Sequence, residues 1–144
     1  QWTDTNGNYL PIIASTYDSS NRHILQHATN GKLYYINSTY YTDEDALFNV
    51  DIVTPTFDAT TRRRKTLSMM EIIADQTPGS TLQIRNTDND YTTWTNFRKV
   101  DLSIKRPLLQ NCGTFVKRSY HLRHRANTSF RIQAIEMQYD VGTL

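Results

Sequence analysis

The residues best suited to chemistry are four histidines, His23, His27, His121 and His124. Imidazole can bind a metal ion or transfer a proton near neutral pH. However, His23 and His27 lie at the two ends of a predicted strand and turn, and the odd spacing of His121 and His124 places them on opposite faces of a strand. Neither pair has the H-E-x-x-H context of a zinc site. The sequence therefore predicts no metal site.

Signals for nucleophilic or nucleotide-dependent catalysis are missing from the sequence. There is no G-x-S-x-G turn and no glycine-rich phosphate loop, and Cys112 lies in an apparent turn at residues 110–113. A single cysteine also excludes an internal disulfide and a cysteine-ligated zinc site. We therefore expect a protein that is not an enzyme and needs no cofactor.

Basic residues gather in two places, which makes them candidates for an interface or for contact with DNA. The first cluster is Arg62, Arg63, Arg64 and Lys65, and the second is Lys117, Arg118, Arg123, Arg125 and Arg131. Arginine and lysine suit phosphate groups, but a solvated loop for the first cluster and a charged strand face for the second are the simpler interpretation. Aromatic residues do not alternate with these arginines along the chain, so no base-stacking platform is predicted.

Residues 87–94 resemble an Asp-box, the S-x-D-x-G-x-T-W turn between strands of sialidase-type propellers. The turn contains Asp88, Asp90 and Trp94, while Asn89 stands where the motif has aspartate and Tyr91 where it has glycine. Aspartate and asparagine side chains cap the amides of such turns, and the tryptophan packs against the next strand. The motif predicts a structural turn.

The elements that position these residues are predicted to be strands, because apolar and polar residues alternate along most of the chain. Asn30-Gly31 predicts a hairpin that joins residues 22–26 to 33–36, and Thr54-Pro55 ends a strand over 46–53. The segment 66–74 fits a strand or a short helix, and the turn signals after it favour the strand. Further strands are expected at 82–84, 96–102, 113–123 and 130–141.

In the last of these strands the apolar parity changes at Ala134-Ile135, so a β-bulge is expected there. Turn signals about every ten residues indicate an all-β protein, either a sandwich or propeller blades. We expect two regions, a hairpin region over 1–54 that resembles the end of a β-propeller, and an antiparallel β-sandwich over 55–144.

Composition and charge limit the classes of partner. The 144 residues are 38% hydrophobic and 21% charged, and no apolar run approaches the roughly 18 residues of a membrane helix, so no membrane partner is expected. Residues 1–60 hold two basic and seven acidic residues, a net charge of −5, whereas residues 61–144 hold fourteen and seven, a net of +7. Such asymmetry suits two surfaces with different partners, or copies that meet acidic end to basic end.

The order of these features resembles the C-terminal part of the tail-nozzle, or packaged-DNA-stabilisation, proteins of short-tailed bacteriophages. The resemblance rests on short stretches at residues 30–34, 51–55, 87–94, 113–114, 117–125 and 135–142. It implies a virion component, made in the bacterial cytoplasm, that forms a ring below the portal and helps to retain packaged DNA. The implied partners are further copies of itself, portal or tail-adaptor proteins, and tail fibre or spike proteins, with no catalytic residues.

Two other functions remain open from the residues alone. A carbohydrate-binding β-sandwich or sialidase-like receptor-binding module would use exposed rings from among Trp2, Tyr40, Tyr41, Tyr91 and Trp94. Direct, non-specific DNA binding would use the basic residues of 62–65 and 123–131, and its affinity would fall steeply with salt.

Overall fold

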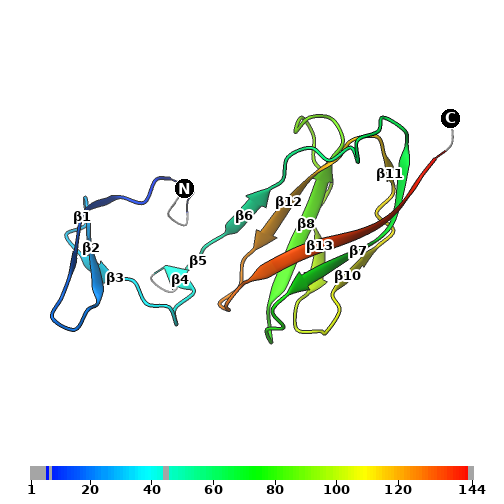
Figure 1. Ribbon diagram of the computed structural model, residues 1–144. Helices are drawn as coiled ribbons and strands as arrows, with labels where there is room; N and C mark the ends of the chain where they lie inside the picture. Colours follow the sequence, from blue (N-terminus) through cyan, green and yellow to red (C-terminus); the bar gives the residue numbers. More distant parts are fainter. Residues whose placement is uncertain (1–5, 7, 44–45, 143–144) are drawn as a thin grey trace. The chain divides into compact units, whose positions relative to one another are not determined.

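The computed structural model describes residues 6, 8–43 and 46–142 (Figure 1). All regular elements in these residues are β-strands, which confirms the all-β class. The described part of the chain contains no helix long and apolar enough to cross a membrane. The chain divides into two compact units, Gln1–Phe48 and Asn49–Leu144.

The first unit is built on a small antiparallel sheet. Its strands are β1 (Ile12–Tyr17), β2 (His23–His27) and β3 (Leu33–Tyr35), and β4 (Thr42–Asp43) pairs separately with β5 (Ala46–Leu47). The predicted hairpin is confirmed as β2–β3. Gly31 has a positive φ of 71° in the connecting turn, a conformation that glycine adopts without strain. The likeness to a propeller end stays a prediction.

The second unit contains two four-stranded sheets. In one, β7 (Lys65–Ala74) pairs with β13 (Ile132–Val141) along one edge and with β10 (Leu108–Gln110) and β11 (Thr114–Phe115) along the other. In the other, the order is β6 (Val50–Val53), β12 (Ser119–His124), β8 (Thr81–Thr87) and β9 (Arg98–Asp101). Figure 1 shows β13 lying along β7, and the predicted antiparallel sandwich is confirmed.

One apolar core joins the two sheets of the second unit. Leu67, Met70 and Ile72 come from β7, and their side chains are at most 1% exposed. They pack in the same cluster as Leu82 and Leu122 of the other sheet. Removing such side chains from water is the main favourable contribution to folding, at roughly 1.5–3 kcal/mol each.

Two register shifts keep this core continuous. The predicted bulge in the last strand is present, one position earlier than expected, because the shift lies between Ile132 and Ala134 with Gln133 as the extra residue. A second shift, which the sequence did not predict, leaves Ser68 as the extra residue of β7. It returns Lys65 and Leu67 to the face that Met70 occupies.

Two predicted strands are each divided in the structure. Residues 46–53 form β5 and β6, which belong to different units, and β6 joins the second unit because it pairs with β12. Residues 113–123 form β11 and most of β12, which lie in different sheets. The chain crosses from one layer to the other at residues 116–118, so this prediction of one strand was wrong.

The core makes a direct prediction about stability. Leu82→Ala should lower the free energy of unfolding by about 2–5 kcal/mol, because it leaves a cavity at a fully buried site. Ile104→Ala, at a side chain 48% exposed, should change it by less than about 1 kcal/mol. Urea unfolding of both variants measures the difference, and equal losses would contradict the assigned core.

Candidate functional site

The first basic cluster is divided between solvent and the protein interior. Arg62, Arg63 and Arg64 are exposed, but Lys65 is 0% exposed. The Nζ of Lys65 donates to the carbonyl oxygens of Thr61 at 2.7 Å, of Arg63 at 2.9 Å and of Val116 at 2.7 Å. The expectation that Lys65 faces DNA or a partner is therefore corrected: its charge is used to fix two loops.

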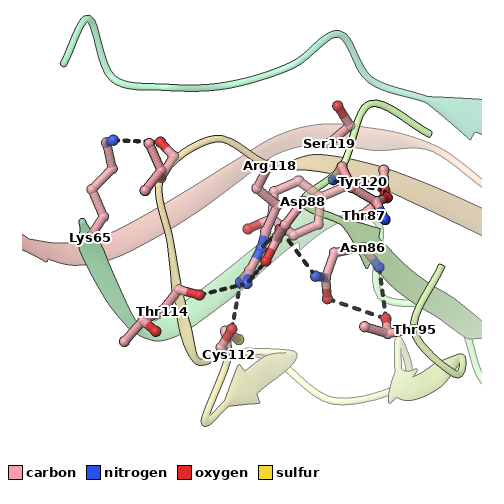
Figure 2. Close-up of polar contacts among 12 residues, drawn as sticks. Lys65, Asn86, Thr87, Asp88, Thr95, Cys112, Thr114, Arg118, Ser119 and Tyr120 are labelled. Atoms are coloured by element: carbon pink, nitrogen blue, oxygen red, sulfur yellow. Dashed lines mark hydrogen bonds and ion pairs between the residues drawn. The ribbon is translucent and has the colours of Figure 1, made fainter. Parts of the chain in front are cut away.

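The expectation that Arg118 faces DNA or a partner is corrected as well. Its side chain is 4% exposed and forms a bidentate ion pair with Asp88, with Nε–Oδ1 at 2.7 Å and Nη2–Oδ2 at 2.8 Å (Figure 2). It also donates to the carbonyl oxygens of Cys112 and Thr114. A buried guanidinium needs these acceptors, because an unpaired charge in the interior is costly. Arg118 thus holds the turn that follows β8 against the chain before β12.

We call Lys65, Arg118, Asp88 and the ring of Phe115 the cation cluster. The guanidinium carbon of Arg118 lies 4.5 Å from the Phe115 ring centroid, and Lys65 Nζ lies 5.6 Å from it. Burial raises the pKa of the neighbouring Tyr120 to about 12 and also raises the pKa of the Cys112 thiol. Both groups therefore stay protonated at neutral pH, and the thiol lacks the thiolate character of a nucleophile.

The Asp-box-like turn caps itself, as predicted for a structural turn. The Asn89 side chain accepts from the Thr93 amide at 2.9 Å and from the Thr87 hydroxyl at 2.8 Å. Asp90 and Tyr91 have φ of 54° and 66° at the centre of the turn. Asp90 also pairs with Lys117, but this pair is open to solvent, in contrast to that of Asp88.

The half-buried ring of Trp94 contacts Arg85 of β8 and His121 of β12. The Arg85 guanidinium lies over Trp94 at 5.0 Å and over Phe97 at 4.5 Å, and that of Arg123 lies over Phe97 at 5.2 Å. We call these four side chains the arginine–aromatic stack. The sequence did not predict this stack, because its arginines and rings come together across strands and do not alternate along the chain.

His121 and Asp51 link the two arginines of the stack. Arg85 Nε donates to His121 Nδ1 at 3.0 Å, and His121 Nε2 lies 2.6 Å from Asp51 Oδ1. Arg123 donates to both Asp51 oxygens. Partial burial raises the pKa of Asp51, but the hydrogen bonds from Arg123 and His121 lower it more, so the pKa lies below its usual value. The carboxylate is therefore ionised at neutral pH.

His124 lies on the opposite face from His121, which confirms the parity prediction. Its Nε2 is 3.0 Å from the Ser80 hydroxyl, and its ring stacks on Phe130 with centroids 4.6 Å apart. Burial lowers the pKa of His124, which favours the neutral ring. Ser80 is fully buried, so this pair of side chains is a core contact that substrate cannot reach.

The remaining predicted residues are spread over separate surfaces. Arg125 and Arg131 are exposed, and Arg131 pairs with Asp75. Of the candidate sugar-binding rings, Tyr40 and Tyr41 belong to the first unit, Tyr91 and Trp94 belong to the second, and Trp2 lies outside the described residues. Within the described ranges, no three His, Cys, Asp or Glu side chains are grouped as a metal would require.

The first unit contains a groove of about 950 Å³. Its lining comes from the sheet and from described residues on either side of it, and it is mainly apolar or aromatic, with Leu25, Tyr34, Tyr40 and Phe48 among the residues. Polar groups such as His27 and Asp43 line it as well.

Comparison with known proteins gives no identification: no protein-family model and no curated protein matches the chain.

The two aspartates of the turn allow a matched test of the cation cluster. Asp88→Asn should destabilise the protein by about 1–3 kcal/mol, because it leaves the buried Arg118 without its carboxylate. Asp90→Asn, at the exposed pair with Lys117, should cost less than about 1 kcal/mol. Denaturant titration gives both values, and an equal effect would show that Arg118 is not held by Asp88.

Stability should also depend on pH through His124. Its folded pKa lies below the unfolded value of about 6.5, so the neutral ring contributes stability above that pH. As the pH falls from about 7 towards 5, the unfolded state takes up a proton that the folded ring resists, and stability declines. His124→Gln should flatten this part of the unfolding-midpoint profile. An unchanged slope in the variant would assign the decline to another group.

Proposed function

We propose that this protein is a structural component of a bacteriophage tail that functions by assembly, as part of a nozzle ring below the portal. In this role it would extend the tail tube and help to retain packaged DNA. Its partners would be further copies of itself, portal or tail-adaptor proteins, and fibre or spike proteins in the virion. The phage assignment rests on the sequence resemblance, and the role of assembly rests on the first unit.

The observation that carries the proposal is that no described residue of the first unit is buried. The sheet presents exposed apolar side chains: Leu33 is 68% exposed and Tyr35 is 50% exposed on β3, and Ile13 on β1, the opposite edge strand, is 63% exposed. Leu33 and Tyr35 share one face with Ile24, as the strand register requires. A sheet this small gains stability when another surface covers that face.

Charge favours a second copy as the covering surface. The first unit holds two basic and five acidic residues, a net charge of −3, and the second holds fourteen basic and nine acidic residues, a net charge of +5. Arg62, Arg63 and Arg64 are exposed in the second unit and form no ion pair with the described residues. Opposite charges on one chain support head-to-tail contacts, the type that closes rings.

Light scattering after size exclusion tests this proposal. The chain should elute as a multiple of 16.8 kDa or together with a purified portal ring, and high salt should weaken the association. The double variant Leu33→Ser, Tyr35→Ser should elute as a monomer, because it removes the apolar face. Ile104→Ser, at an apolar residue of the second unit whose 48% exposure is close to the 50% of Tyr35, is the matched control and should assemble normally.

A wild-type chain that stays monomeric at high concentration and ignores the portal ring would overturn the proposal. If the double variant still assembles, the protein is an oligomer, but the first unit is not its interface.

A further inference from the structure

We propose that the outer face of the sheet β6–β12–β8–β9 binds the phosphodiester backbone of a nucleic acid strand without reading its bases. The sheet register places the relevant groups side by side. Arg123 of β12 lies opposite Asp51 of β6 and Gln83 of β8, and Gln83 lies opposite Lys99 of β9. Two residues along β12, on the same face, His121 lies opposite Arg85. All these side chains point away from the core that Leu122 and Ile84 enter.

The cations of this face exceed the acidic groups that could neutralise them. Both oxygens of Asp51 accept from Arg123, and Oδ1 also lies beside His121. The Asp101 carboxylate accepts from the Ser103 amide. Within the described residues, Arg85 and Lys99 pair with no carboxylate, and the two terminal nitrogens of Arg85 make no hydrogen bond. Arg85 and Lys99 therefore retain charge and donors for an external anion.

The arginine–aromatic stack fixes Arg85 before any ligand arrives. Its guanidinium lies over the rings of both Trp94 and Phe97, and its Nε donates to His121. Less conformational entropy is then lost on binding, and a guanidinium edge matches two phosphate oxygens. Phe97 is already covered by Arg85 and Arg123, so bases find few open ring faces. This arrangement favours contact with phosphates over stacking with bases.

Fluorescence anisotropy with labelled dT and dA strands of about 20 nucleotides tests the proposal. The protein should bind both strands with similar affinity, and affinity should fall as salt rises from about 50 to 200 mM. Lys99→Gln should reduce the slope of log affinity against log salt by about 0.7, the loss of one phosphate contact on a single strand. Arg85→Gln should also reduce this slope, and a thermal melt reports whether the variant stays folded. If it does not, Lys99→Gln, at an exposed side chain, decides the result.

The matched control is Arg62→Gln, Arg63→Gln, which removes two exposed charges from a loop outside this face. The proposal requires this control to keep the wild-type slope. Absence of binding at about 50 mM salt, or an equal loss in the loop control, would overturn it. A strong dT preference, competition by inorganic phosphate at matched ionic strength, or equal affinity for polyglutamate would also overturn it, because each indicates a different ligand. None of these outcomes depends on ring assembly, which light scattering measures separately.

Discussion

The register between β12 and β8 is the constraint on which the second unit depends. With Leu122 opposite Ile84, both side chains enter the core, and the next pair outward is His121 opposite Arg85. A slip of one residue would exchange the two faces and bury an arginine in place of a leucine. The same register therefore builds the core, separates His121 from His124, and assembles the arginine–aromatic stack. Core packing and surface chemistry in this sheet have one cause.

Two buried cations fix the positions of the loops. Lys65 is satisfied by three carbonyl oxygens, and Arg118 by Asp88 and two more carbonyls. These bonds join the loop before β7, the turn after β8 and the chain that crosses between the sheets. The Asp-box-like turn is thus held at its base by an interior ion pair. The charges of Lys65 and Arg118 stabilise the fold and are not available to a surface partner. The exposed loop arginines and the outer sheet face remain accessible for interactions.

Local signals predicted most of the strands but little of the site. Asn30-Gly31 predicted the hairpin, and the turn signals after residues 66–74 favoured a strand there. Alternation predicted the strand at 130–141, and its change of parity predicted the bulge near Ala134. The burial of Lys65 could not be predicted, because one of its acceptors, the Val116 carbonyl, lies 51 residues away. The stack was missed for the same reason: its members come from different strands and the turn between them. Contacts across strands follow from register, which one sequence does not give.

The two units differ in how completely they bury their apolar side chains. The second has a continuous core and satisfied interior charges, whereas the first has exposed apolar faces and an excess of acidic groups. The central claim is that another copy covers the first unit's sheet. Hydrogen exchange measured at low and high protein concentration tests it most directly. The account predicts that amides of β1–β3 gain protection as concentration rises, while those of β7, β8 and β12 stay unchanged. Exchange in β1–β3 that does not vary with concentration would contradict it.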